Sequence, residues 1–172
     1  AAFALLADFK LDIAPMVRAV KNFKGLSHRM QTVAQTNGVV WVNDSKATNI
    51  GATASALKSL EQPIIWIAGG EGKGADFNEL AELDSTQIKH LITLGRDGDQ
   101  IAKVFAKRLP INSVKTLNEA VLLAAELAVK GDLVLLSPAC ASCDMFANYV
   151  ERGEQFVECV TALTSAKLRK GA

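Results

Sequence analysis

The sequence predicts an α/β fold built on a mostly parallel sheet, from three observations. Short apolar runs alternate with stretches of helical spacing along most of the chain. Several of these runs are continuously apolar, as in strands that are buried on both faces, and they end in glycines or polar loops. The length of 172 residues and the 49% of apolar residues suit one folded domain with a short additional segment. Strands that alternate with helices form parallel sheets through right-handed crossovers.

The first part of the chain is predicted to be helical. Ala1–Ala7 and Ile13–Phe23 are short apolar stretches, and the second has Asp12 as a candidate N-cap and Pro15 in its first turn. Lys24-Gly25 then gives a plausible helix stop. The composition changes at this point, so we expect a hinge there.

A β-hairpin is predicted next. Met30–Thr36 alternates apolar and polar residues, Asn37-Gly38 follows, and Val39–Val42 is strand-like. Asn-Gly between two such runs is the strongest short-range hairpin signal. The hairpin would add an antiparallel edge to the sheet.

The remaining strands and helices alternate. Largely apolar stretches predict buried strands at Pro63–Ala68, Ile88–Leu94 and Leu133–Leu136, and a short strand is expected at Ile111–Val114. Helical spacing and capping signals predict helices at Asn49–Leu60, Phe77–Leu83, Asp97–Leu109, Thr116–Val129 and from Asp144 onward. The expected architecture is a Rossmann-like, mostly parallel sheet flanked by helices, with an N-terminal antiparallel hairpin.

Composition argues against several classes of partner. The net charge of +1 gives no field that would attract nucleic acid or an anionic membrane, and no apolar run is long enough to span a bilayer. Three cysteines are too few, and odd in number, for a disulfide framework, so a cytoplasmic location is expected. His28 and His90 lack ligand spacing to the cysteines, and no metal site is predicted.

Three polar or glycine-rich segments follow predicted strands. They are Asn43–Asn49, Gly69–Gly74 and Ser137–Ser142. Ligands of open α/β sheets bind beyond the carboxyl ends of the strands, so a site is expected there. Each segment is also compatible with an ordinary surface loop.

In the first segment, Asp44, Lys46 and Thr48 occupy every second position. In extended backbone this spacing would point a carboxylate, an ammonium and a hydroxyl to one side, where they could hold a metal–phosphate and a carboxylate. The alternative is a polar strand-to-helix loop with Asn49 as the N-cap.

The second segment places Lys73 on a glycine-rich turn. It is not a P-loop, because Ile67 occupies the position of the first motif glycine and Gly74 follows the lysine. One interpretation is a lysine on backbone that a ligand can approach closely, and the other is a solvated turn lysine.

The third segment leads into the last predicted helix. Free N–H groups at the helix start and the Ser142 hydroxyl would form a carboxylate site, whereas capping by Ser142 or Asp144 is the alternative. Cys140-Ala-Ser-Cys143 also matches C-x-x-C, which opens a redox interpretation. Its position after the last strand and the odd number of cysteines argue against that function.

Taken in order, five segments are more specific than any one of them. They are GLSHR (25–29), NDSKATN (43–49), GGEGKG (69–74), LGRDG (94–98) and SPACASCDMF (137–146). Together they resemble the C-terminal domain of the Mur ligases, and most closely that of the D-glutamate-adding members. The resemblance implies a glutamate-binding domain over residues 25–172, whereas residues 1–24 resemble the last helical part of the family's central ATP-binding domain.

The resemblance implies an ATP-dependent amide-forming ligase in peptidoglycan precursor synthesis. ATP would phosphorylate the carboxylate of UDP-N-acetylmuramoyl-L-alanine, and the amine of D-glutamate would attack the acyl phosphate. Mg²⁺ would neutralise the phosphates. The family's P-loop, magnesium ligands and UDP-binding domain are not in these residues. These 172 residues alone are therefore expected to be inactive.

Roles toward ATP carry over by motif position. Arg29 and Asp44 match residues that contact ATP, and Lys46 matches a residue near the transferring phosphate and the incoming glutamate. Asp44 and Lys46 are therefore the expected catalytic residues. Glu71 stands where the family often has Asp, which keeps the charge and changes the reach.

Roles toward D-glutamate carry over in the same way. Thr48, Lys73 and Ser142 match residues that hold its carboxylates, and cations, hydroxyls and N–H groups suit a dianion. Cys143 stands where Leu or Phe is common, so only a backbone contact is carried over there. Tyr149 stands where Phe is usual and would add a hydroxyl near the glutamate.

A different class of protein is also compatible with the fold and the loops. It is a stand-alone Rossmann-like module that binds a nucleotide or an acidic metabolite without chemistry. Such a module would have a tight nucleotide site of its own, whereas the ligase interpretation requires the other domains for ATP binding.

Overall fold

A six-stranded sheet forms the centre of the protein in the computed structural model, which describes residues 12–23 and 25–170. The strand order is β1-β2-β6-β3-β4-β5. The bounds are β1 Gln31–Thr36, β2 Val39–Asn43, β3 Ile64–Gly69, β4 Ile88–Leu94, β5 Ile111–Ser113 and β6 Leu133–Leu136. The predicted fold class is confirmed, because β1 pairs antiparallel with β2 and the other described pairings are parallel.

The predicted hairpin forms one edge of the sheet. Thr36 pairs with Val39 across the two-residue turn Asn37-Gly38. Asn37 and Gly38 have φ angles of 53° and 74°, and two positive values are what a type I′ turn requires. The turn sequence therefore fixes the register of β1 against β2.

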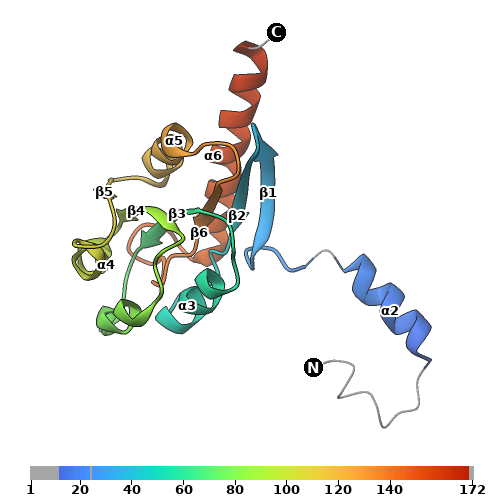
Figure 1. The fold of residues 1–172 in the computed structure, drawn as a ribbon, viewed down its shortest axis with the longest axis horizontal. Helices are drawn as coiled ribbons and strands as arrows, with labels where there is room; N and C mark the ends of the chain where they lie inside the picture. The colour runs from blue at the N-terminus through green and yellow to red at the C-terminus, as the bar shows by residue number, and fades with distance from the viewer. Residues whose placement is uncertain (1–11, 24, 171–172) are drawn as a thin grey trace.

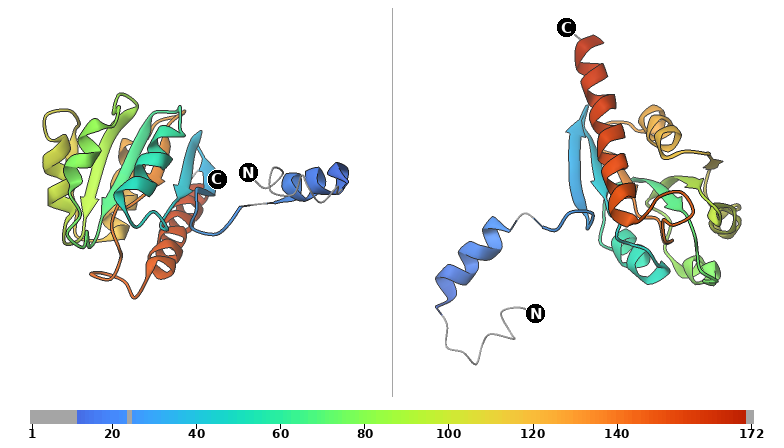
Figure 2. Two further views of the ribbon diagram at one scale, coloured as in Figure 1. Left: turned by 90° about the horizontal axis from the view of Figure 1, so that it is seen from below. Right: turned by 180° about the vertical axis from the view of Figure 1, so that it is seen from behind.

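Helices cover both faces of the sheet (Figure 1). One hydrophobic cluster lies under α3 (Ile50–Lys58), the 3₁₀ helix η2 (Phe77–Glu82) and α4 (Gly98–Phe105). A second cluster lies under α5 (Leu117–Leu127) and α6 (Tyr149–Lys170), and Figure 2 shows α6 running beside β1 and β2. None of the described helices combines the length and the apolar composition needed to cross a membrane.

Strand β3 shows how an apolar run serves both faces. Ile64, Trp66 and Ala68 belong to the first cluster, whereas Ile65 and Ile67 belong to the second. Successive side chains of a strand point to opposite faces, so a run without polar residues fits a strand that is covered on both sides. β3 lies between β6 and β4, and all of its residues are buried.

Helix α2 (Ile13–Asn22) stands apart from the sheet in both figures. Asp12 caps it as predicted, since its Oδ1 accepts a hydrogen bond from Ala14 N at 3.0 Å. None of the residues of α2 is buried, and Ile13 is 66% exposed. The predicted helix at 1–7 and the predicted stop residue at 24 lie outside the described residues.

The last helix begins at Tyr149 and not at Asp144, so that prediction was wrong. Residues 142–146 form a turn in which Phe146 N donates to Ser142 O at 2.8 Å. Asn148 Oδ1 accepts the first free N–H groups of α6. Asp144 is a residue type that often caps helices, but its carboxylate accepts from the β4–α4 loop instead.

Candidate functional site

The loops that follow β2, β3 and β6 meet at the carboxyl edge of the sheet. Because β6 lies between β2 and β3, the three segments are neighbours although they are far apart in the chain. Gly69 N donates to Pro138 O at 2.9 Å, and Glu71 and Ala141 exchange two backbone hydrogen bonds of 2.9 Å. The three predicted segments therefore lie side by side at this edge of the sheet.

Asp44 is a buried carboxyl at the end of β2. Its Oδ2 accepts from Ser137 Oγ at 2.9 Å, and its Oδ1 accepts from Met30 N at 3.2 Å. Burial raises the pKa of this carboxyl, while the two hydrogen bonds and the Arg29 guanidinium oppose the rise. The two hydrogen bonds fix the orientation of the Asp44 carboxyl, and its pKa depends on the charges that lie beside it.

Arg29, Asp44 and Lys46 line one cavity of about 220 Å³. The other lining residues are Met30, Ala47, Ala52, Ser55, Ala56 and Ser59. The small side chains come mostly from α3 and leave room beside the charged groups. Two cations next to one carboxyl suit a phosphate-bearing ligand, so these residues fit part of a nucleotide.

The backbone from Asp44 to Thr48 is not extended, although the spacing argument assumed that it is. The backbone leaves β2 in a turn, in which Thr48 N donates to Lys46 O at 2.8 Å. Asp44 is buried against the end of β6, whereas Lys46 Nζ lies 4.0 Å from the centroid of the Tyr149 ring. The assumption of extended backbone was wrong, because the chain makes a tight turn here. Asp44 and Lys46 nevertheless line the same cavity, and Thr48 is not among its lining residues.

The residues expected to hold glutamate carboxylates come from all three loops. Lys73 and Cys143 are exposed, Thr48 is half-buried and Ser142 is buried. The last helix begins at Tyr149, so the free N–H groups of a helix start that were expected beside the Ser142 hydroxyl are not there. Ser142 lies in the preceding turn, where its own carbonyl accepts two N–H groups.

Arg152 is the principal residue of this region that the sequence did not indicate. It enters from α6 and is 2% exposed. Its Nη2 donates to Ser45 O at 2.9 Å and to Cys140 O at 3.1 Å, and its Nε donates to Ser45 Oγ at 3.0 Å. Burial lowers the pKa of Arg152 to about 10, so the guanidinium stays charged at neutral pH. It joins the loop after β2 to the loop after β6.

Gly153, the residue after Arg152, is the sequence feature that could have indicated that this part of α6 packs closely against another segment. A Cβ atom there would lie 2.2 Å from His28 Nδ1, so the residue must be glycine for the segment before β1 to approach α6. Asn43 Nδ2 donates to Gly153 O at 3.0 Å and lies 3.1 Å from His28 Nδ1. A glycine inside a helical stretch marks such a close approach, and this rule points to the neighbourhood of Arg152.

The two cysteines of the C-x-x-C segment differ in accessibility. Cys140 is fully buried, and burial raises the pKa of its thiol to about 12. Cys143 is exposed, and both residues are free thiols. Reactivity needs access and thiolate character, and Cys140 has neither. In the part of the chain that the structure describes, no group of three His, Cys, Asp or Glu side chains could hold a metal ion.

Thiol titration of the native protein with a chromogenic disulfide reagent at pH 8 is expected to show fast reaction at Cys143 alone. Cys140 should react only after denaturation, since it is buried as a thiol. Cys143→Ser should remove the fast phase, and Cys159→Ser, at a half-buried position, serves as the control. A reversible disulfide between Cys140 and Cys143 under mild oxidation would contradict this and favour the redox interpretation.

Comparison with known sequences identifies relatives over nearly the whole chain. A family model described as "Mur ligase, glutamate ligase domain" matches residues 28–140. Proteins named UDP-N-acetylmuramoylalanine--D-glutamate ligase are 47% identical in Nitrosomonas europaea and 52% identical in Idiomarina loihiensis. The alignments cover 93% and 95% of this chain but 34% and 35% of those proteins. The chain therefore spans about a third of the length of these curated relatives.

Solved structures share the fold at low sequence identity. The UDP-N-acetylmuramate-alanine ligase of Thermotoga maritima superposes with a TM-score of 0.67 at 14% identity, over 93% of this chain and 36% of that chain. The bifunctional folylpolyglutamate synthase/dihydrofolate synthase of Yersinia pestis gives 0.65 at 16%, over 91% and 37%. These likenesses concern the fold, whereas the family match covers well over half of the sequence. The chain belongs to the Mur ligase family, as a glutamate ligase domain.

Proposed function

We propose that this chain is the D-glutamate-accepting domain of an ATP-dependent UDP-N-acetylmuramoyl-L-alanine:D-glutamate ligase of peptidoglycan precursor synthesis. The observation that carries the proposal is the meeting of three charged and polar loops at one sheet edge. Two relatives that are identical to this chain at about half of the aligned residues are named for this activity.

The nucleotide side of the site would be the cavity beside α3. Arg29 and Asp44 would contact ATP, and Lys46 would lie at the transferring phosphate. The cation–π contact with Tyr149 holds the Lys46 ammonium in place, which favours a fixed charge over a mobile one. Mg²⁺, when bound, would neutralise the phosphates, with ligands from the central domain of the complete ligase.

The amino-acid side would be formed by residues of all three loops. Lys73, Thr48 and Ser142 would hold the D-glutamate carboxylates, with the Cys143 backbone and the Tyr149 hydroxyl beside them. Holding both carboxylates fixes the direction of the amine toward the acyl phosphate. This positioning would be the contribution of the domain to amide formation.

The proposed function also implies a division of the chain into parts of two domains. Residues 1–24 would belong to the central ATP-binding domain, residues 25–172 would form the glutamate-binding domain, and the junction would be the hinge. α2 supports this division, because it stands apart from the sheet and none of its residues is buried. The N-terminal and central domains would be the partners of this domain, in the cytoplasm.

An assay of the complete ligase tests the proposal. ADP release is expected to require both UDP-N-acetylmuramoyl-L-alanine and D-glutamate and to be far slower with L-glutamate or D-aspartate. The 172 residues alone are expected to show no turnover and little affinity for ATP. D-glutamate-independent ADP release would contradict the proposal, and tight ATP binding by the 172 residues would favour the stand-alone module.

A further inference from the structure

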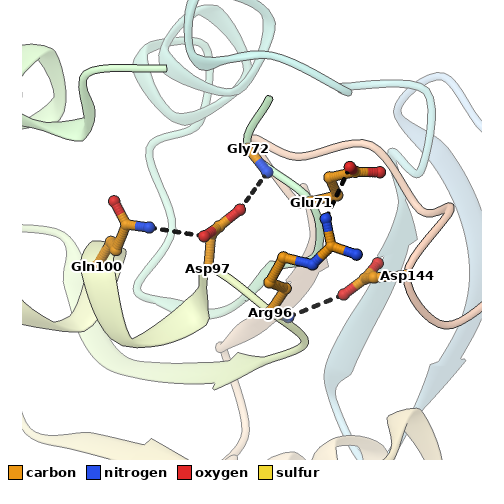
Figure 3. A network of polar contacts seen from close by, with 6 residues as sticks. All are labelled: Glu71, Gly72, Arg96, Asp97, Gln100 and Asp144. Atoms are coloured by element: carbon orange, nitrogen blue, oxygen red, sulfur yellow. Dashed lines mark hydrogen bonds and ion pairs between the residues drawn. The ribbon is translucent and has the colours of Figure 1, made fainter. Parts of the chain in front are cut away.

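Asp97 occupies the N-cap position of α4 but does not cap that helix. An N-cap carboxylate normally accepts an N–H of the first helical turn, and Asp97 makes no such bond. Its Oδ2 accepts from Gly72 N at 2.7 Å, and its Oδ1 accepts from Gln100 Nε2 at 2.6 Å (Figure 3). Its own N–H donates to Gly70 O at 2.9 Å. Asp97 therefore anchors the loop after β3, and its carboxylate holds α4 only through the side chain of Gln100.

The anchored loop has an unfavourable backbone conformation at Lys73. Lys73 has a φ of 53° and Gly74 a φ of 77°. A residue with a Cβ is disfavoured in this region and stays there when its surroundings hold it. Gly72 is held on both sides of its peptide, since its O accepts from Ala75 N at 3.1 Å while its N donates to Asp97. The direction of the Lys73 side chain therefore depends on Asp97.

Arg96, the residue before Asp97, pairs with Glu71, which precedes Lys73 by two residues in the same loop. Its Nη1 lies 2.8 Å from Glu71 Oε1, and its N–H donates to Asp144 Oδ2 at 2.8 Å (Figure 3). An unpaired Glu71 carboxylate, two residues from Lys73, would repel an anionic substrate. The side chains are 60% and 26% exposed, so this ion pair is expected to contribute little to stability.

We propose that Asp97 and Arg96 are positioning residues of the amino-acid site. Asp97 sets the direction of Lys73 through Gly72, and Arg96 neutralises Glu71. The inference rests on the proposed function, because it assigns an amino-acid carboxylate to Lys73. Both residues act through the loop and need not touch the substrate.

Steady-state kinetics of the complete ligase test Asp97. Asp97→Ala is expected to raise the KM for D-glutamate by roughly 10- to 30-fold, as for the loss of a hydrogen bond to a charged group, with the KM for ATP within about twofold. Asp97→Asn keeps an oxygen that can accept from Gly72 N and should recover most of the affinity. Asp99→Ala removes the same charge from the first turn of α4 and should change neither constant. Equal increases in both constants for Asp97→Ala would overturn the inference.

A double substitution tests Arg96. Arg96→Ala is expected to raise the KM for D-glutamate by roughly 3- to 10-fold, as for a partly exposed charge near a bound ion. Adding Glu71→Gln in the same protein should return the KM close to that of the unsubstituted enzyme, because the repelling charge is then gone. Losses that add up instead would show that Arg96 does not act through Glu71.

Hydrogen–deuterium exchange of residues 69–76 in the complete ligase gives a readout without substrate. Asp97→Ala should accelerate exchange in this segment, and Asp99→Ala should not. Unchanged exchange would overturn the anchoring role. If Lys73→Ala leaves the KM for D-glutamate unchanged, the proposed function of this loop fails. Accelerated exchange would then support the anchor alone and overturn its assignment to the amino-acid site.

Discussion

Replacing Lys73 with alanine in the complete ligase is expected to raise the KM for D-glutamate by about 30- to 1000-fold and to leave the KM for ATP nearly unchanged. The range corresponds to about 2–4 kcal/mol, the cost of removing one partner of a buried charged contact. Lys73 is exposed in the protein by itself, so the effect would arise only when the substrate covers it. Initial rates at varied D-glutamate and ATP measure both constants.

Two further variants serve as comparisons for Lys73→Ala. Lys107→Ala removes an exposed lysine outside the three loops and should behave like the unsubstituted enzyme. Asp44→Ala should instead slow the ATP-dependent step, because Asp44 lines the cavity beside α3. Normal kinetics for Lys73→Ala and Asp44→Ala would remove both residues from the site.

Replacing Arg152 with methionine is expected to lower the free energy of unfolding of the domain by about 3 kcal/mol. The guanidinium makes three hydrogen bonds, and its loss would leave Ser45 O and Cys140 O buried without this donor. Methionine fills much of the same volume, so the loss of hydrogen bonds is measured with little cavity formation. Urea unfolding can be followed by tryptophan fluorescence, since Trp41 and Trp66 are buried.

The control for that experiment is another arginine that bonds to carbonyl oxygens. Arg108 donates to Ala81 O at 3.0 Å but is exposed, so Arg108→Met should cost less than about 1 kcal/mol. Arg152→Lys keeps the charge but not the planar set of donors, and should fall between the two. An unchanged urea midpoint for Arg152→Met would show that the two loops do not depend on this residue.

The elements of the sheet could be predicted because their signals are local. Ile88–Leu94 and Leu133–Leu136 have the predicted bounds, since the first is rich in apolar residues, the second is continuously apolar, and each stops at a glycine or a polar loop. The strand order could not be predicted in the same way. Val40 of β2 and Ile64 of β3 both lie beside Leu133, and no local pattern states which strands will be neighbours.

The candidate site could likewise be predicted only as far as local sequence patterns allow. Sequence motifs located the three loops but not the directions of their side chains, because those depend on partners in other loops. Asp144 was a candidate helix cap by sequence, but in the structure its carboxylate accepts a hydrogen bond from Arg96 N at 2.8 Å. No motif included Arg152, because its acceptors lie on two segments that are distant in the chain.

The position of β6 also determines when the domain can fold during synthesis. In the described sheet, β6 joins the β1–β2 hairpin to the β3–β4–β5 half, yet it is the last strand to leave the ribosome. Until then, the nascent hairpin presents Trp41 and Val42 without the strand that later lies beside them. Such non-local closure is slow and exposes apolar edges to aggregation. Ribosome-bound chains that stop before residue 133 are therefore expected to need chaperone protection, which longer chains should lose as soon as β6 can pair.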